Sequence, residues 1–480
     1  MQQKFLFRLS IVLLSAILVL ASSCSRTQNW PQFRGPGSNM LTPATNLPEE
    51  WDTIKNIAWT YDLDGAGWSS PVIWGDKIFV TSVFAVKTNP APERGPMPGP
   101  PPGGGQPQPG QPAQGQQPMP NQPGQNPPQG PPQPEVRDTS YLQELYRWQI
   151  TCVDLNTGRE LWKQVAYEGV PKAGKNPNST YACETPATDG KRVYAYFGMH
   201  GLFCYDLNGT LLWKKDLGVF YTQRGWGTGS SPLLYDDVLY IKNDNEENSF
   251  LAAFDTETGN ELWRIQRDEK TGYSTPYIWR NNVRTELITT GKTARSYDPG
   301  TGKLYWELKL GGEQAIPSPV GNQEILYLGN AGGRQAPGAL FAVKAGAGGD
   351  ISLAEGQVKN EWVAWTYPEA NLGNASPLLY NEKLYIVSSR GGEILCMNPV
   401  NGEVIYKGRV PGIGAVWASP WGYNGKIWFY DENGITLSLQ GGDTFEYAQD
   451  NKLDDRFWAS VAITGDSYVF RGVKKLYCIK

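Results

Sequence analysis

Histidine is almost absent from this sequence of 480 residues, which contains only one, His200. A zinc site built on several imidazoles and a triad with a histidine base are therefore not expected, whereas a metal site made of carboxylates remains open. Charged residues make up 19% of the chain and the formal net charge is −4. Because no basic excess is present to neutralise phosphates, we expect no nucleic-acid partner.

Long hydrophobic runs are missing too, apart from one at the N-terminus. Lys4 and Arg8 precede an apolar stretch from Leu9 to Leu20, which is shorter than the roughly 20 residues of a membrane-spanning helix. A basic region followed by such a stretch is typical of a signal peptide, which we predict over residues 1–23. The stretch ends in LASSC, similar to a bacterial lipobox although its leucine lies one place further upstream than usual.

The cysteine of this sequence, Cys24, is the predicted lipidation site. Acyl chains on Cys24 would anchor an otherwise soluble protein to the envelope, and we expect the periplasmic side of the outer membrane. Ordinary signal cleavage, with Cys24 incidental, is the alternative. Residues 24–55 are predicted to form the anchored tether and a lead-in segment.

Two short elements recur along the remaining chain. One is a phrase that leads to a tryptophan: CVDLNTG before Trp162, CYDLNG before Trp213, AFDTETG before Trp263 and SYDPGTG before Trp306. The other is a small residue followed by proline and an alternating aromatic or aliphatic run. It occurs at Pro71, Pro186, Pro232, Pro276, Pro319, Pro377 and Pro420, with a degenerate copy at Ser460-Val461.

Each proline element predicts two strands joined by a tight turn, and each tryptophan phrase adds a third and a fourth strand. Units of four strands, most of them about 40–45 residues apart, are typical of propeller blades. We therefore predict an all-β, eight-bladed propeller of four-stranded antiparallel blades over residues 56–480. The last unit lacks a fourth strand, and residues 56–62 have the pattern of one. We expect these two segments to pair and close the propeller.

Residues 88–135 interrupt the first blade between its second and third strands and consist almost entirely of Pro, Gly and Gln. This composition lacks the apolar side chains that offset ordering entropy, so the insert is predicted to be disordered. It is either a solvated loop or a docking segment for a partner.

The phrase Ala/Cys-x-Asp-x-x-Thr-Gly-x-x-x-Trp resembles the pyrroloquinoline-quinone (PQQ) repeat. Apart from the insert, residues 30–480 resemble the bacterial PQQ-like β-propeller repeat proteins, and the opening WPQFRGP is similar to one envelope subgroup of them. This superfamily includes calcium- and quinone-dependent alcohol dehydrogenases. It also includes the non-enzymatic propeller lipoprotein of the outer-membrane β-barrel assembly machinery. The resemblance therefore implies a fold and leaves the activity open.

The tryptophans of the phrase are expected to be structural, each ring packing between neighbouring blades and covering the turn made by the Thr-Gly phrase. Cys152, Cys204, Cys396 and Cys478 share one repeat position. Equivalent positions on adjacent blades are about 10 Å apart, beyond the roughly 7 Å that a disulfide spans between Cα atoms. We expect free thiols, with a redox pair as the alternative.

The candidate ligand or partner face lies just before the repeat prolines, where the chain rings one mouth of the central channel. Trp68, Trp417 and Trp458 come from neighbouring blades and predict an aromatic crescent there. The other residues assigned to this face are Glu184, Tyr221, Arg224, Trp226 and Tyr273. Aromatic and arginine side chains on a concave mouth favour protein, peptide or carbohydrate ligands, although they can also simply plug the channel.

The function that we favour is a non-enzymatic envelope lipoprotein, a monomeric propeller that serves as a scaffold for protein partners, including in outer-membrane protein assembly. A carbohydrate- or peptide-binding accessory propeller is one alternative. A PQQ- and calcium-dependent alcohol or sugar dehydrogenase is the other. The related dehydrogenases carry a disulfide between adjacent cysteines, and no Cys-Cys pair occurs here. We therefore expect no cofactor and assign no catalytic or metal-binding residue.

Overall fold

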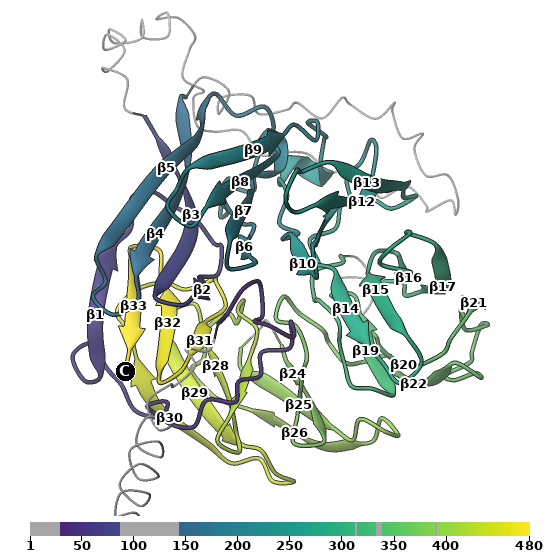
Figure 1. The fold of residues 1–480 in the computed structure, drawn as a ribbon. Coiled ribbons are helices and arrows are strands. Elements are labelled where there is room, and N and C mark those ends of the chain that lie inside the picture. The colour runs from purple at the N-terminus through teal and green to yellow at the C-terminus, as the bar shows by residue number, and fades with distance from the viewer. Residues whose placement is uncertain (1–28, 87–143, 313, 333–337, 389–390) are drawn as a thin grey trace, which may run out of the picture.

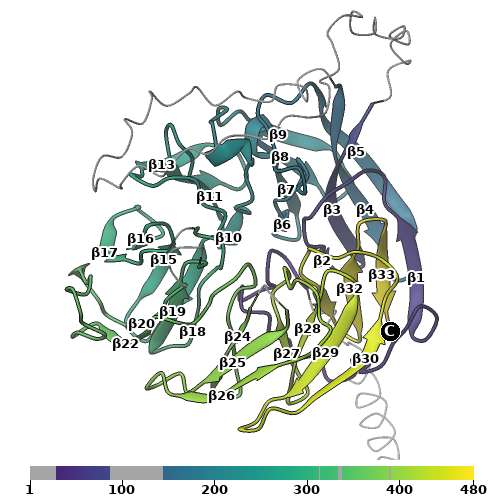
Figure 2. The same ribbon diagram turned by 180° about the vertical axis from the view of Figure 1, so that it is seen from behind.

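The structure is a computed structural model that describes residues 29–86, 144–312, 314–332, 338–388 and 391–480. Eight small sheets surround a central axis like the blades of a propeller (Figures 1 and 2). The first strands of neighbouring blades contact one another around that axis. The predicted eight-bladed all-β propeller is confirmed. The lipobox and the predicted insert at 88–135 lie outside the described residues, and the sequence places that insert between β3 and β4.

The first four blades follow one another along the chain. Blade one contains β2 (Val72–Trp74), β3 (Lys77–Ala85), β4 (Tyr146–Asp154) and β5 (Glu160–Gly169). Blade two contains β6 (Ala187–Thr188), β7 (Arg192–Tyr196), β8 (Leu202–Asp206) and β9 (Leu211–Lys215). Blade three contains β10 (Leu233–Tyr235), β11 (Val238–Asn243), β12 (Phe250–Asp255) and β13 (Glu261–Gln266). Blade four contains β14 (Tyr277–Arg280), β15 (Thr285–Thr289), β16 (Thr293–Tyr297) and β17 (Leu304–Lys309), with β21 (Gly349–Asp350) added parallel to β17.

The other four blades complete the ring. Blade five contains β18 (Val320–Gly321), β19 (Ile325–Gly329), β20 (Leu340–Lys344) and β22 (Val363–Tyr367). Blade six contains β23 (Leu378–Tyr380), β24 (Lys383–Val387), β25 (Glu393–Met397) and β26 (Val404–Arg409). Blade seven contains β27 (Trp421–Tyr423), β28 (Lys426–Tyr430), β29 (Ile435–Gln440) and β30 (Tyr447–Lys452). Blade eight contains β31 (Ala462–Thr464), β32 (Ser467–Arg471), β33 (Lys475–Ile479) and β1 (Ile57–Asp62). Two short 3-10 turns, η2 (Gly198–His200) and η3 (Gln223–Gly225), lie in the connections.

The propeller closes as predicted, because β1 from the start of the chain pairs antiparallel with β33 at its end. Trp59 on β1 lies opposite Cys478, so blade eight has the same outer pair as the other blades. Both ends of the described propeller are thereby held in one sheet, and no strand edge is left open between them.

The tryptophan phrase is a lock between blades, as expected. The indole Nε1 of Trp59 donates to the carbonyl oxygen of Leu155 in the next blade at 2.7 Å, and Trp162 donates to Leu207 at 2.9 Å. The ring also lies flat against the phrase glycine of that blade, where a Cβ at Gly158 would come within 2.6 Å of the Trp59 ring. Because Gly158 has φ +70°, the turn and the ring both require glycine.

The repeat position that Cys152 and Cys204 share is occupied by small residues because of the tryptophan beside it. Cys152 pairs directly with Trp162 across the sheet, and Cys204 pairs with Trp213. A small side chain leaves room for the large ring beside it. All five cysteines of the described ranges are free thiols, in agreement with the expected lack of disulfides.

Residues 29–56, which we call the strap, run across one end of the propeller (Figure 1). Trp30 pairs with Ile73 of blade one, and Leu41 forms a bridge to Gly422 of blade seven. Between them, the buried guanidinium of Arg34 donates to the carbonyl oxygens of Pro319 at 2.8 Å and Pro377 at 3.0 Å. The strap therefore covers the axis from blade one to blade seven.

Candidate functional site: the proline face

The two ends of the channel are built differently. At the end that we call the proline face, the chain approaches the first strand of each blade through a Ser/Thr–Pro segment. At the other end, the turn face, each first strand turns back into the second strand, and the strap lies here. The strap forms most of its contacts at or near this end, including those of Ile73, Thr188 and Leu234.

The Ser or Thr before each repeat proline ties the proline face together. At six of the eight positions, the backbone N–H donates to the side-chain hydroxyl of the equivalent residue in the next blade, at 2.9–3.1 Å. The donor and acceptor pairs are Ser70 and Thr185, Thr185 and Ser231, Ser231 and Thr275, Thr275 and Ser318, Ser318 and Ser376, and Ser419 and Ser460. These hydroxyls fix the loops that carry the candidate residues. The sequence showed that Ser or Thr recurs there, but not that it links the blades.

The structure brings the three tryptophans of the predicted crescent into one row. Trp68 of blade one stacks on Trp458 beside blade eight, with ring centroids 4.8 Å apart and planes inclined by 10°. The guanidinium of Arg456 lies 4.7 Å above the Trp458 ring. Glu432 accepts hydrogen bonds from Arg456 at 3.4 Å and from the indole N–H of Trp417 at 3.2 Å. We call these five residues the crescent; it spans blades seven, eight and one.

The second part of the predicted face lies on the connection between blades two and three. The guanidinium of Arg224 lies 5.2 Å from the centre of the Trp226 ring, and Arg224 itself has a left-handed backbone with φ +55°. Tyr221 is held through its backbone N–H, which donates to Glu247 at 2.7 Å. Tyr273, on the next loop, has a half-buried ring whose hydroxyl is enclosed. Arginine and aromatic side chains thus occur on both parts of the face.

Glu184 differs from what we expected of it. It was assigned to the surface of the face, but its side chain is buried and 2% exposed. The Thr228 hydroxyl donates to its carboxyl group, and burial raises the pKa of that group to about 7. Burial also raises the pKa of the neighbouring Cys183 thiol, whose sulfur contacts the carbonyl oxygen of Thr180 at 3.2 Å. Glu184 therefore supports the loop from beneath instead of facing a ligand.

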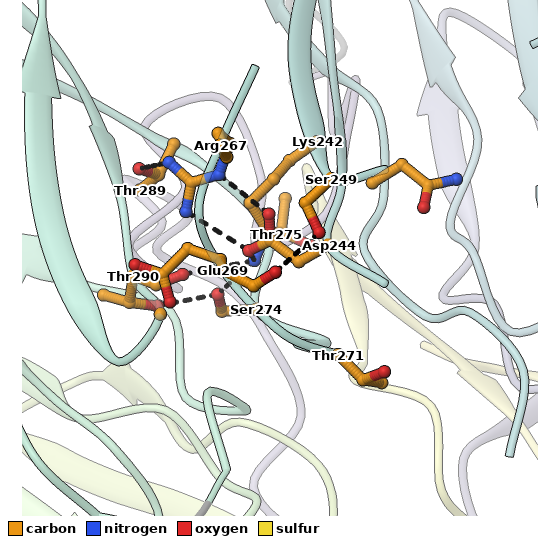
Figure 3. A network of polar contacts seen from close by, with 12 residues as sticks. Lys242, Asp244, Ser249, Arg267, Glu269, Thr271, Ser274, Thr275, Thr289 and Thr290 are labelled. Atoms are coloured by element: carbon orange, nitrogen blue, oxygen red, sulfur yellow. Dashed lines mark hydrogen bonds and ion pairs between the residues drawn. The ribbon is translucent and has the colours of Figure 1, made fainter. Parts of the chain in front are cut away.

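A network of buried charges joins blades three and four (Figure 3). Lys242, Asp244 and Arg267 have side chains that are 0% exposed. Arg267 donates to both carboxylate oxygens of Asp244, at 2.7 and 3.2 Å, and Lys242 lies 3.2 Å from the second oxygen. Burial opposes ionisation of Asp244, but the two cations outweigh it and hold its pKa below the ordinary value. Since solvent does not reach these groups, their role is structural.

A calcium–quinone centre would need several oxygen ligands on this face. Hard cations such as Ca²⁺ take six to eight oxygen ligands. Glu184, the acid in the position before a repeat proline, is already engaged by Thr228. Within the described ranges, no three His, Cys, Asp or Glu side chains are grouped so that they could hold a metal ion. The same part of the chain has no helix long and apolar enough to cross a bilayer.

Comparison with known proteins supports the fold. The family model described as outer membrane protein assembly factor BamB matches residues 147–276. Tetrathionate hydrolase from Acidithiobacillus ferrooxidans is 28% identical over 127 residues, which is 26% of this chain and 24% of that protein. The chain therefore matches about a quarter of the length of this curated relative.

Solved structures of two kinds share the architecture. BamB from Moraxella catarrhalis is 13% identical with a TM-score of 0.50, over 69% of this chain and 91% of that one. Quinohemoprotein alcohol dehydrogenase from Comamonas testosteroni is 11% identical with a TM-score of 0.53, over 96% of this chain and 81% of that one. At such identities the likeness shows the fold alone. Residues 147–276 thus resemble this family of repeat proteins, and the eight blades show that the whole described chain has the propeller fold.

Proposed function

We propose that this protein is a non-enzymatic lipoprotein of the cell envelope that binds a partner protein with its proline face, with outer-membrane protein assembly as the specific role. The observation that carries the proposal is the crescent. Its side chains come from three adjacent blades, and Trp417 is 37% exposed. The matched family description, an outer-membrane assembly factor, supports the same choice.

The chemistry of the crescent suits a protein surface. Tryptophan and arginine are the side chains that contribute most binding energy at protein interfaces, particularly where neighbouring contacts exclude water. In the crescent, Glu432 holds Arg456 and Trp417 in place before any partner arrives. Such preorganisation lowers the side-chain entropy lost on binding. Among the described residues, the strap covers the other end of the channel and leaves the crescent accessible.

A lipid anchor would orient this face. The strap begins at Asn29, whose side-chain oxygen accepts a hydrogen bond from the Gly75 N–H at the turn face, at 2.9 Å. Only residues 25–28 separate Asn29 from Cys24, so the two Cα atoms lie within about 19 Å of each other. If Cys24 is acylated, the turn face lies near the membrane and the proline face is directed away from it, towards periplasmic partners.

Site-specific photo-crosslinking in native cells tests the partner proposal. We expect a photo-reactive amino acid at position 417 to crosslink a discrete envelope protein, and Trp458→Ala to weaken that crosslink. The matched control is position 262 on the outer edge of blade three, where Leu262 is 52% exposed. The same products from both positions, or none from position 417, would contradict a partner site at the crescent.

The anchor and the enzymatic alternative have separate tests. Metabolic labelling with a fatty-acid analogue should modify the protein and fail with Cys24→Ser. Purified protein mixed with PQQ and Ca²⁺ should give no dye-linked oxidation of alcohols or sugars. Turnover in that assay would establish a dehydrogenase instead, whatever the crosslinking shows.

A further inference from the structure

A second candidate site lies at the opposite end of the propeller, on the turn face. A cavity of about 310 Å³ opens there between the strap and the first turns of blades one to four. Pro31, Gln32 and Pro36 of the strap line it on one side. The other sides are formed by Trp74 of blade one, the turn of blade two and Tyr235 of blade three, with Arg280 of blade four at the margin.

The walls of this turn-face cleft are held by contacts between blades. The Trp74 ring lies against Gly190 of blade two so closely that a Cβ at this glycine would come within 2.1 Å of the ring. Gly190 also has φ +82°, which favours glycine. On the other side, the guanidinium of Arg280 lies 5.1 Å from the centre of the Tyr235 ring. Two half-buried aromatic rings thus take fixed positions around the cavity.

The strap closes the cleft to an incoming β-strand. The backbones of Trp30 and Ile73 exchange two hydrogen bonds of 2.8 Å, and the Thr188 N–H donates to the Pro31 carbonyl oxygen at 2.8 Å. In blade three, the N–H of Leu234 donates to the Gln32 side chain at 2.8 Å. The strand edges that would recognise an extended peptide are therefore occupied. A ligand of this cleft is recognised by side chains.

Those side chains include charged groups of both signs that form no ion pair with a described residue. These groups are Lys191, Asp236, Asp237 and Arg280, all of which line the cavity. Asp189, by contrast, is engaged, since it accepts a hydrogen bond from the Tyr194 hydroxyl at 2.7 Å. The cleft thus offers the carboxylates of Asp236 and Asp237 from blade three and the cations of Lys191 and Arg280 from blades two and four. Because these groups carry two negative and two positive charges, they do not select a simple ion of one sign.

We propose that the turn-face cleft binds a carbohydrate group of one or two sugar units. Hydroxyl groups both donate and accept hydrogen bonds, so a sugar can use the carboxylates and the cations together. The apolar face of a sugar ring suits the aromatic walls formed by Trp74 and Tyr235. The volume lies at the lower end of the range of about 300–1,000 Å³ for small-molecule sites. The inference does not depend on the partner proposed for the crescent.

Calorimetric titration of the purified protein with maltotetraose, cellotetraose, chitotetraose and mannotetraose tests this proposal. We expect at least one of them to bind with a Kd of about 1 mM or lower. Arg280→Gln, at the exposed end of β14, and Asp237→Asn, in an exposed turn, should each weaken that binding about tenfold, the usual cost of losing one charged hydrogen bond. Trp417→Ala, at the proline face, should leave it unchanged.

Three results would overturn the proposal. One is that none of the four sugars binds at about 10 mM, well above the weak affinities expected of a small open site. Another is that a sugar binds but loses affinity with Trp417→Ala and not with Arg280→Gln, which would move the site to the crescent. The third is that a short peptide, rather than a sugar, shows binding that Arg280→Gln and Asp237→Asn abolish.

Discussion

Replacing Asp244 by asparagine probes the buried network between blades three and four. The side chain keeps its shape, but Lys242 and Arg267 lose the carboxylate that they share. Both cations have side chains that are 0% exposed, so water cannot take its place. The asparagine amide also turns an N–H group towards one of the donors, at a position where Arg267 now donates at 2.7 and 3.2 Å. Removing one partner of a buried ion pair costs about 3–5 kcal/mol, and we expect Asp244→Asn to lower the free energy of unfolding by this amount.

Urea denaturation at pH 7, followed by tryptophan fluorescence, measures the loss. Glu261→Gln is the matched control, because it breaks the largely solvated Glu261–Arg264 pair of blade three and should cost less than about 1 kcal/mol. The triple variant Lys242→Met/Asp244→Leu/Arg267→Met removes all three charges together and should recover most of the stability. If Asp244→Asn cost no more than Glu261→Gln, the network would not hold the two blades together, and our reasoning would fail.

Three further predictions concern other parts of the molecule. Trp213→Ala removes the ring packed on Gly259 and should lower the free energy of unfolding by about 3 kcal/mol in thermal denaturation. Trp213→Phe loses mainly the hydrogen bond to Thr256 and should cost about 1 kcal/mol. Burial lowers the pKa of His200 to about 4, so below pH 7 the folded protein binds fewer protons than the unfolded chain. The free energy of unfolding should therefore fall by about 2 kcal/mol between pH 7 and pH 4.5. His200→Gln should abolish this loss in urea titrations at the two pH values. The pKa of Glu184 is raised to about 7, so stability falls as pH rises from 5 to 8, and Glu184→Gln should flatten that decline in a series of melting curves.

The blade architecture was predictable because its causes are local and repeat. The Asp–Thr–Gly turn is held within a few residues: Asp255 accepts hydrogen bonds from both the N–H and the hydroxyl of Thr258. The tryptophan that follows the turn packs on the glycine of the same phrase in the next blade. Where the next copy is missing the lock changes, and Trp306 instead donates to Glu286 of its own blade at 2.8 Å. Periodicity therefore indicated both the fold and the place where it becomes irregular.

The candidate site was predictable only in part. Counting back from each proline placed Trp68, Trp417 and Trp458 on neighbouring blades, and the first and last of these stack. Glu432 and Arg456 link these tryptophans, but neither occupies the repeat position three residues before the proline. Their place in the crescent depends on side-chain packing, which the spacing of residues in the sequence does not reveal. Burial of Glu184 depends likewise on Thr228, which lies 44 residues later. The assignment of this face to a partner remains a prediction.

The strap was the largest omission, and its cause is physical. Arg34 donates to carbonyl groups of Pro319 and Pro377, which follow it by 285 and 343 residues. Contacts of such range occur once, leave no periodic signal and belong to a segment with no copy elsewhere in the chain. A run such as WPQFRGP, rich in proline and glycine, resembles an ordinary linker by composition. The sequence therefore indicated a lead-in segment at this place, and only the packing shows where that segment lies on the propeller.

Because of the strap, the two ends of the propeller are formed by different segments of the chain. The hydroxyl ring and the crescent of the proline face come from the blades and the loops between them, and within the described ranges the strap reaches this face only through Arg34, which donates to Pro319 and Pro377. The turn-face cleft needs both the repeats and the strap, since Gln32 lines the cavity and holds the backbone of Leu234. Changes in the strap should therefore alter ligand binding at the cleft without moving the crescent. The two proposed sites are separable by mutation.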